Sequence, residues 1–261
     1  MTSGERAPIA FDRVGRGESL VLVHANGMSG RAWRPVLPML SRERDVIVID
    51  LPGHGRSPPV PPHVTPAPPG FAWLLSRFLD ELGIDRAHVA GNSLGGWTAL
   101  ELGRLERALS VVAFGPAGLW ERGPIRPMLA LSMTHRAARR WPRPARRLVS
   151  TRVGRRLLLS HTFGDPDRIP AADATMLVDA LAQASEFQAT LVATHMSRFR
   201  GGQQIDVPVS IVFGGRDHVV PATARRSDEL PAHTTWREPP ALGHVPMWDD
   251  PELVAELVLG G

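Results

Sequence analysis

Five short hydrophobic runs recur along the chain, and each ends in residues typical of loops. They are rich in Val, Ile, Leu and Ala and are continuously apolar rather than alternating, which is typical of strands buried on both faces of a parallel sheet. A weaker run, TTWREPP at 234–240, predicts a last strand. The five strong runs lie at 20–27, 45–53, 87–92, 109–116 and 207–215.

Helical patterns separate these runs at 29–40, 71–83, 94–105 and 251–259. The last of them opens with Pro251, a residue favoured in the first turn of a helix. Strands that alternate with helices predict an α/β fold with a mostly parallel, doubly wound sheet.

Two segments interrupt the alternation. Residues 58–69 hold seven prolines in twelve positions, and we expect a stiff surface loop there because the alternation continues on both sides. From 119 to 206 the strand signal vanishes and Arg- and Ala-rich helical sequence replaces it. The sequence therefore predicts an α/β core at 1–118 and 207–261, with a helical segment inserted at 119–206.

Composition narrows the possible chemistry. The 261 residues include no cysteine, which excludes disulfides, cysteine-ligated metal sites and a thiol nucleophile. The first residues, MTSGERAPIAFD, do not resemble a signal peptide, and the apolar runs are far shorter than the roughly 20 residues of a membrane span. We expect a cytoplasmic protein with no membrane partner.

The basic residues are unevenly distributed. All thirty are arginine, and residues 122–156 carry eleven of them without any Asp or Glu, although the formal net charge of the chain is only +4. Such a block is either a solvated helical face or a region that attracts an anionic substrate or an acidic partner. No nucleic-acid partner is expected, because no recognisable reader motif accompanies the arginines.

The stretch Gly91-Asn92-Ser93-Leu94-Gly95 follows a predicted strand and opens a predicted helix. A G-x-S-x-G in this context is typical of a nucleophile elbow, a sharp turn that lifts the serine Oγ above the sheet. Glycines are needed on either side because side chains there would collide with the neighbouring strand and helix. The helix N-terminus also favours developing negative charge. Ser93 is therefore the predicted nucleophile.

A serine nucleophile needs a general base, and the base needs an acid that orients it. In folds with this elbow the chain order is serine, acid, histidine. His218 directly follows Asp217, too close for one to orient the other, and His233 precedes the last predicted strand, at the wrong end of the sheet. His244 follows that strand in ALGHVPMW and is the predicted base.

The predicted acid is Asp217, in FGGRDHVVP, because it comes directly after a strand and emerges at the same sheet edge as Ser93. Asp228 and Glu229 fall in the helix expected to follow, and Glu238 falls inside the last strand. The alternative role for Asp217 is that of a helix cap or turn residue.

An oxyanion hole needs two backbone N–H donors aimed at the developing charge. Leu94, directly after the nucleophile, offers one, and the loop at residues 24–27 offers the other, from Asn26. His24 and His54 lie near strand ends before the serine, and we expect both to be structural histidines that bond to nearby backbone.

Five pieces occur in an order that resembles the α/β-hydrolase superfamily, specifically its cap-bearing branch of small esterases, cofactor-free haloperoxidase-type enzymes and meta-cleavage-product carbon–carbon hydrolases. They are VHANG, IDLPGHGRS, GNSLGGWTAL, GGRDHVVP and GHVPMWDDPELVAELV, and they cover residues 20–118 and 207–259. The resemblance implies a Ser93–His244–Asp217 triad, an oxyanion hole from Asn26 and Leu94, and a helical cap. It implies no cofactor and no metal.

The chain departs from the family pattern at His24-Ala25, where His-Gly is usual, and the alanine narrows the conformational options of that loop. Dehalogenases and epoxide hydrolases of this fold use an aspartate nucleophile, and Ser93 argues against both. The resemblance implies a serine hydrolase that forms an acyl-enzyme on a small carboxylic ester or a related carbonyl substrate. Carbon–carbon cleavage, perhydrolase, lyase or cyclase chemistry on the same triad stays open, as does a non-catalytic ligand-binding homologue.

The predicted cap contains groups that resemble metal ligands, but their spacing fits no ligand pattern, so we expect them at the surface or in a pocket lining. They are His135, His161, His195, Asp165 and Asp167. A second set either lines an apolar substrate pocket or packs the cap onto the core. It consists of Met128, Met133, Trp141, Met176 and Phe187.

Overall fold

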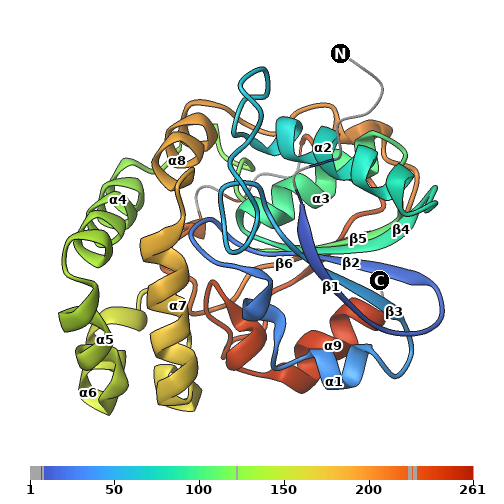
Figure 1. The fold of residues 1–261 in the computed structure, drawn as a ribbon. Helices are drawn as coiled ribbons and strands as arrows, with labels where there is room; N and C mark the ends of the chain where they lie inside the picture. Colours follow the sequence, from blue (N-terminus) through green and yellow to red (C-terminus); the bar gives the residue numbers. More distant parts are fainter. Residues whose placement is uncertain (1–6, 8, 122, 223–224, 226–227, 261) are drawn as a thin grey trace.

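The computed structural model describes residues 7, 9–121, 123–222, 225 and 228–260. Seven strands form one sheet in the order β1-β3-β2-β4-β5-β6-β7, in which β1 runs antiparallel to β3 and all other neighbours are parallel (Figure 1). The predicted α/β fold is confirmed. The strands are β1 Ala10–Gly15, β2 Ser19–Val23, β3 Asp45–Asp50, β4 Ala87–Asn92, β5 Ala108–Phe114, β6 Val209–Val212 and β7 Thr235–Arg237.

Helices cover both faces of the sheet, with α2 and α3 on one side and α1 and α9 on the other (Figure 1). Because successive side chains of a strand point to opposite faces, β2 contributes to both cores. Val21 and Val23 pack in the cluster that contains α2 and α3. Leu20 and Leu22 pack in the cluster that contains α1 and α9. The helix bounds are α1 Leu37–Leu40, α2 Pro68–Glu81, α3 Leu94–Arg104 and α9 Pro251–Leu259.

Near the N-terminus, the structure differs from the sequence pattern at two elements. Residues 29–40 do not form one helix but a 3-10 helix, η1 at Gly30–Trp33, followed by the short α1. Pro35 lies between them and has no N–H with which to continue a helix. No apolar run predicts β1, because this edge strand is largely exposed and its sequence, AFDRVG, is mixed. The proline-rich residues 58–69 form the predicted loop until α2 begins at Pro68.

The hydrophobic runs extend beyond the strands. Residues 24–27, 51–53 and 213–215 lie outside regular strands, directly after the carboxyl ends of β2, β3 and β6. The carboxyl ends of parallel strands meet at one edge of the sheet, which is where ligand sites of open α/β folds lie. These loops therefore converge near the turn after β4.

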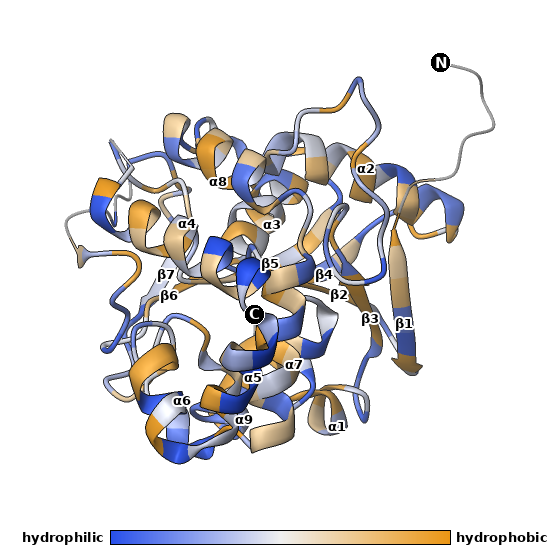
Figure 2. Ribbon diagram, turned by 60° about the vertical axis from the view of Figure 1, so that its left-hand side comes forward, coloured by the Kyte–Doolittle hydropathy of each residue, from blue (hydrophilic) through white to orange (hydrophobic). Residues whose placement is uncertain are grey.

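The chain between β5 and β6 is helical and holds no strand among its described residues. Helix α7 packs against α4 and α5 and lies between them and the sheet, so that α4, α5 and α6 form an outer layer (Figure 1). Figure 2 shows hydrophilic and hydrophobic residues side by side along these helices. The bounds are α4 Ile125–Arg140, α5 Pro142–Ser150, α6 Arg152–Leu159, α7 Ala171–Gln183 and α8 Phe187–Met196, with the 3-10 helices η2 Pro166–Arg168 and η3 Gly202–Gln204.

Near the C-terminus, Asp228 and Glu229 lie in a turn, so the helix predicted for them is wrong over these described residues. Glu238 directly follows β7 and bonds to Arg225 rather than lying inside the strand. Within the described ranges, no helix has both the length and the apolar character that crossing a bilayer demands.

Candidate active site

Ser93 lies in the turn between β4 and α3. Its backbone has φ 54° and ψ −110°, and it is one of two non-glycine residues with a positive φ in the described part of the chain. This conformation is strained for a residue that carries a Cβ. The Ser93 N–H donates to the carbonyl of Phe114 at 2.8 Å, which ties the turn to the neighbouring strand. The backbone therefore has the sharp strand-to-helix geometry that the motif predicts.

The glycines on either side of this turn contact main chain so closely that no side chain fits. A Cβ on Gly91 would lie 2.1 Å from the carbonyl oxygen of Gly95, and a Cβ on Gly95 would lie 2.2 Å from that of Val23. The collision predicted for side chains at both positions is confirmed.

His244 and Asp217 form a buried pair at the same edge of the sheet. Nδ1 of His244 donates to Oδ2 of Asp217 at 2.9 Å, and both side chains are almost fully enclosed. This bond places the proton on Nδ1, which leaves Nε2 as the nitrogen able to accept one. The sequence-predicted acid and base are therefore brought together.

The second carboxylate oxygen of Asp217 is also fixed. Oδ1 accepts the N–H groups of Val219 and Val220 at 2.8 and 2.9 Å. Burial acts to raise the pKa of Asp217, but His244 and the two N–H donors outweigh it and hold that pKa below its ordinary value. A carboxylate that stays ionised orients the imidazole and stabilises its charged form. Asp217 therefore has both roles considered for it: one carboxylate oxygen caps the turn, and the other accepts from His244.

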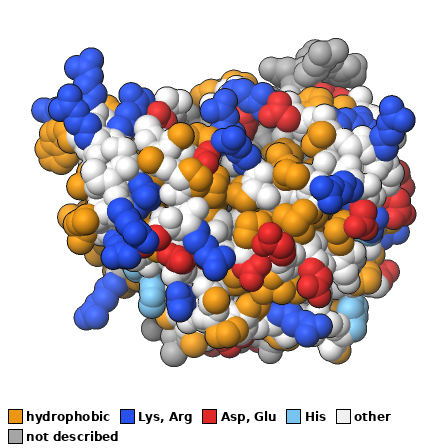
Figure 3. Space-filling model, turned by 90° about the horizontal axis from the view of Figure 1, so that it is seen from below, with side chains coloured by type: hydrophobic (Ala, Val, Ile, Leu, Met, Phe, Trp, Pro, Cys, Tyr) orange, Lys and Arg blue, Asp and Glu red, His pale blue; other side chains and the backbone are white. Residues whose placement is uncertain are grey.

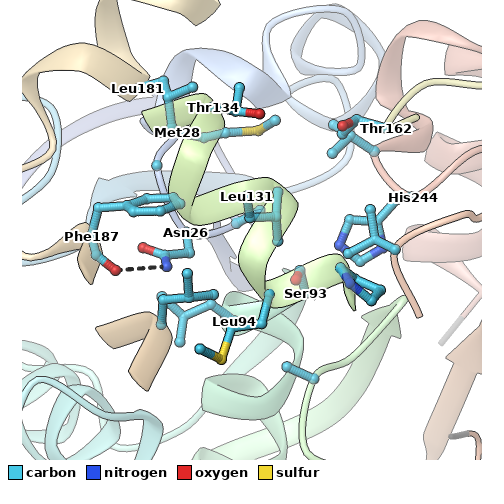
Figure 4. A pocket seen from close by; sticks show the side chains of 18 of the residues that line it. Asn26, Met28, Ser93, Leu94, Leu131, Thr134, Thr162, Leu181, Phe187 and His244 are labelled. Carbon is cyan, nitrogen blue, oxygen red and sulfur yellow. Dashed lines mark hydrogen bonds between the residues drawn. The ribbon is translucent and has the colours of Figure 1, made fainter. Parts of the chain in front are cut away.

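Ser93 and His244 line one pocket (Figure 4). No hydrogen bond joins their side chains in the described part of the chain. Such bonds are often long in unliganded enzymes and shorten in complexes with substrate. The fold thus brings together the three residues of the predicted triad, with the His–Asp contact formed and the serine beside it.

The loop that carries His244 is held by groups that the sequence pattern did not indicate. Asn92 Nδ2 donates to the main-chain carbonyl of His244 at 2.8 Å and to that of Phe114 at 3.0 Å. Asp249 Oδ2 accepts the N–H of Gly243 at 2.8 Å. The N–H of Val245 donates to the carbonyl of Thr162 at 3.0 Å. Asn92 stands inside the elbow motif, but nothing in the sequence links it or Asp249 to the distant histidine.

Gly115 lies against the His–Asp pair. Its φ is +49°, and a Cβ there would lie 2.9 Å from Nδ1 of His244 and 3.1 Å from Oδ2 of Asp217. The residue is therefore confined to glycine both by its backbone and by its neighbours. The end of the run at 109–116 gives no signal of this role.

The two predicted oxyanion donors, Asn26 and Leu94, line the same pocket as Ser93 (Figure 4). Leu94 is the first residue of α3, where backbone N–H groups have no partner within the helix. The Asn26 side chain bridges two segments: Nδ2 donates to the carbonyl of Phe187 at 3.2 Å, and Oδ1 accepts from Nε2 of His54 at 2.9 Å. Asn26 is thereby fixed between the core and the start of α8.

His24 and His54 are buried and bonded to nearby groups, as expected of structural histidines. His24 Nδ1 donates to the carbonyl of Ala25 at 2.8 Å, and its Nε2 accepts the N–H of Leu51 at 2.9 Å. Burial lowers the pKa of His24, and it lowers the pKa of His54 to about 3. Both rings are therefore neutral near neutral pH, and the interpretation of His24 as structural is confirmed.

The pocket is a cavity of about 240 Å³ between the core and α4–α8. Its lining residues all lie in the described part of the chain, and none of them is Arg, Asp or Glu. Only His195 and His244 carry titratable side chains there. Removing an unpaired charge from water is costly, so this cavity suits an uncharged, apolar ligand.

The apolar candidates of the predicted cap divide between the two roles. Met128 and Phe187 line the pocket. Met176 packs against the core cluster that contains α1 and α9, whereas Met133 and Trp141 are exposed on the outer layer.

Most of the remaining candidate groups are engaged in ring stacking, hydrogen bonds or ion pairs. His135 stacks on Phe187 with ring centroids 4.3 Å apart, and His161 stacks on His218 at 6.3 Å. His233 donates to the carbonyl of Val207, before β6 and away from Ser93. Asp167 pairs with Arg152 and Arg156. Among the described residues, no group of three or more His, Asp or Glu is arranged to hold a metal ion.

A strand–serine–helix turn beside a buried His–Asp pair, at the carboxyl edge of a mostly parallel sheet, defines the α/β-hydrolase class of architecture. Residues 20–257 match the model of the Alpha/beta hydrolase family, and the chain belongs to that family.

Two relatives and one solved structure indicate the range of the family. The epoxide hydrolase EphH of Mycobacterium tuberculosis is 33% identical over 202 residues, which are 70% of this chain and 89% of that protein. A 2-hydroxy-6-oxo-6-phenylhexa-2,4-dienoate hydrolase of Comamonas testosteroni is 34% identical over 119 residues, 42% of this chain and 41% of that one. The enol-lactonase of Burkholderia xenovorans LB400 has a TM-score of 0.76 at 21% identity, covers 97% of this chain and 95% of its own, and shows the shared fold.

Proposed function

We propose that the chain is a serine hydrolase that cleaves uncharged carboxylic esters with an apolar acyl or alcohol part. The proposal rests above all on Ser93 and the His244–Asp217 pair lining a single apolar pocket. A strained serine beside a buried, oriented imidazole is the arrangement required for nucleophilic acyl transfer.

In the proposed reaction, Nε2 of His244 takes the proton of the Ser93 hydroxyl as Oγ attacks the ester carbonyl. The carbonyl oxygen becomes an oxyanion, which accepts from the backbone N–H groups of Asn26 and Leu94. Collapse expels the alcohol, which receives the proton from His244, and leaves an acyl group on Ser93. Water, deprotonated by His244, then releases the acid. Asp217 holds the ring and stabilises its charged form throughout.

We further propose that the helices α4–α8 serve as the cap. They supply much of the pocket wall opposite Ser93, including Leu131, Leu181 and Phe187 (Figure 4). The arginines of residues 123–156 contribute no side chain to that wall. The Arg-rich sequence suggested an anionic substrate, but none of these arginines is in the cavity to pair with one.

The similarity to an epoxide hydrolase makes epoxide opening the second candidate. Attack of an epoxide carbon by Ser93 Oγ would join the substrate through an ether, which the proposed acyl-transfer steps do not release. An aspartate at this position instead gives an ester that water can cleave. Ser93 therefore favours ester hydrolysis.

Carbon–carbon hydrolysis is supported less well. The name of the Comamonas relative specifies a dienoate, which carries a carboxylate. A buried carboxylate is stabilised most by a cationic partner, and the cavity lining offers no arginine for it.

The test is a panel of p-nitrophenyl esters of increasing acyl length, run beside an epoxide panel and a carboxylate-bearing diketone. We expect turnover of neutral esters and a loss of roughly 10³-fold or more in kcat for Ser93→Ala. Ser160→Ala, an exposed serine after α6, serves as the matched control and keeps full activity. Turnover confined to epoxides, or equal ester turnover in Ser93→Ala, would contradict the proposal.

A further inference from the structure

The outer layer of α4–α6 exposes large apolar side chains among its arginines. Ile125, Leu129 and Met133 follow one another at four-residue spacing along α4, which puts them on one side of the helix. Their exposed fractions are 64, 52 and 70%, and Leu157 on α6 reaches 71%. Most of the exposed large hydrophobic residues in the described chain belong to the segment between β5 and β6. A surface of this kind marks an interaction site.

The arginines of this surface have few acidic neighbours. The sequence holds no Asp or Glu between Glu121 and Asp165. Arg146 pairs with Asp179, and Arg152 and Arg156 share Asp167. Within the described residues, Arg136, Arg139, Arg143 and Arg147 form no ion pair. Figure 3 shows arginine and apolar side chains interspersed on its left side, where Figure 1 places α4–α6.

Exposed apolar side chains beside these arginines favour one kind of partner over the others. A second copy docked on the same face would set arginine against arginine, which repels. A nucleic acid would pair with the arginines but would leave Leu129, Met133 and Leu157 in water, because a phosphate backbone has no apolar surface on which aliphatic side chains could pack. An anionic bilayer satisfies both, since headgroups pair with the arginines while the apolar side chains enter the acyl boundary.

The same helices form part of the pocket wall. Thr134 and Ala137 of α4 and Leu158 of α6 line the cavity and are also exposed, so these residues belong both to the pocket wall and to the surface of this layer. An apolar ester concentrates in a bilayer rather than in water, so an entrance facing the lipid would admit it directly. Of the arguments for this surface, only the one about entry of the ester rests on the proposed function.

We propose that the face formed by α4, α5 and α6 docks on the surface of anionic lipid bilayers, with its arginines on the headgroups and Leu129, Met133 and Leu157 inserted. Docking of this kind is peripheral and requires no spanning helix. It departs from the expectation, based on the lack of a membrane-length apolar run in the sequence, that the chain has no membrane partner.

The test is co-sedimentation of the full chain with vesicles of phosphatidylcholine, with and without phosphatidylglycerol. We expect binding to the anionic vesicles, weakened by salt. A triple charge reversal, Arg136→Glu/Arg143→Glu/Arg147→Glu, should lower the partition coefficient roughly tenfold or more. The apolar triple, Leu129→Ser/Met133→Ser/Leu157→Ser, should lower it comparably.

Matched controls lie away from this face. Arg16→Glu/Arg31→Glu/Arg42→Glu changes the charge equally at exposed positions near β1 and α1, and Val14→Ser/Trp236→Ser removes exposed apolar residues from β1 and β7. Both controls should bind as the parent does. All variants should keep their turnover of a short, water-soluble ester, because none of the changed residues lines the pocket.

The two proposals fail separately. Binding measured on Ser93→Ala does not depend on catalysis, so absence of vesicle binding overturns the docking surface and leaves the serine hydrolase intact. An equal loss in the control variants also overturns it. So does a dimer in sedimentation velocity that the apolar triple dissociates, or binding to RNA that the apolar triple leaves unchanged.

Discussion

The side-chain amide of Asn92 donates a hydrogen bond to the main-chain carbonyl of His244 across 152 positions of sequence, at 2.8 Å. The same amide donates to Phe114 at the end of β5. The residue directly before the proposed nucleophile therefore holds the loop of the proposed base, so that the elbow and the histidine are positioned by one group.

Replacing Asn92 by Asp keeps the shape of the side chain but removes both donors. We expect the His244 loop to shift, with kcat lowered on the order of tenfold and KM little changed, because small displacements of a reacting group are costly. The buried carbonyl of His244 loses this partner, which costs about 1–3 kcal/mol in unfolding free energy, whereas the carbonyl of Phe114 keeps the Ser93 N–H. Ester kinetics and urea unfolding measure these effects, and unchanged kcat in Asn92→Asp would remove Asn92 from this role.

Gly115→Ala tests how tightly the His–Asp pair is confined. The added Cβ would lie 2.9 Å from Nδ1 of His244, and kcat/KM should fall on the order of 10²-fold. Gly83→Ala is the matched control, because Gly83 also has a positive φ, +70°, but nothing lies within 4 Å of a Cβ there. Both variants should lose stability from backbone strain, by roughly 1 kcal/mol. Only Gly115→Ala should lose activity; equal activity in the two variants would contradict the close packing.

The sequence was sufficient for the parts of the fold and site that local pattern determines. Continuous apolar runs predicted β2–β6 because a parallel strand is buried on both faces, and the elbow motif predicted the strained backbone of Ser93. The pairing of His244 with Asp217 followed from chain order and from the rule that parallel strands end at one edge of the sheet.

What the sequence did not predict depends on contacts between distant segments. β1 is an exposed edge strand whose pairing with β3 leaves no apolar pattern. The contacts of Asn92, Gly115 and Asp249 with the His244 loop join residues that no spacing rule relates. The same holds for the segment 119–206, where periodicity predicts helices but not which of their faces line the cavity.

The buried histidines predict acid sensitivity. The ordinary pKa of His54 is 6.5, and burial lowers it to about 3 in the folded chain. Between these values the unfolded chain binds more protons, so stability is complete above about pH 6.5 and falls as the pH decreases toward 3. The slope is about 1.4 kcal/mol per pH unit for each such histidine.

Urea unfolding followed across this range measures that slope. His54→Gln should flatten it, whereas His63→Gln, an exposed histidine in the proline-rich loop, should leave it unchanged. A parent chain whose stability does not change between about pH 7 and 5 would show that these histidines are not buried in neutral form.

Cavity size predicts selectivity for acyl length. Leu181 lines the pocket and lies across it from Ser93 and His244 (Figure 4). Leu181→Trp should fill part of the cavity of about 240 Å³ and move the preferred p-nitrophenyl ester to a shorter acyl chain. Leu181→Met nearly conserves the volume and should leave the preference unchanged. An identical chain-length profile in the tryptophan variant would place the acyl group elsewhere.

The most direct measurement of the proposed triad is labelling of the full chain with an organophosphonate serine probe, followed by intact mass and peptide mapping. We expect one label per chain, on the peptide that contains Ser93, and none on Ser93→Ala. Asp217→Asn and His244→Ala should slow labelling by roughly 10³-fold or more, whereas Ser160→Ala should label as the parent does. An unlabelled parent chain, or a label that persists in Ser93→Ala, would contradict the assignment of Ser93 as a nucleophile activated by His244 and Asp217.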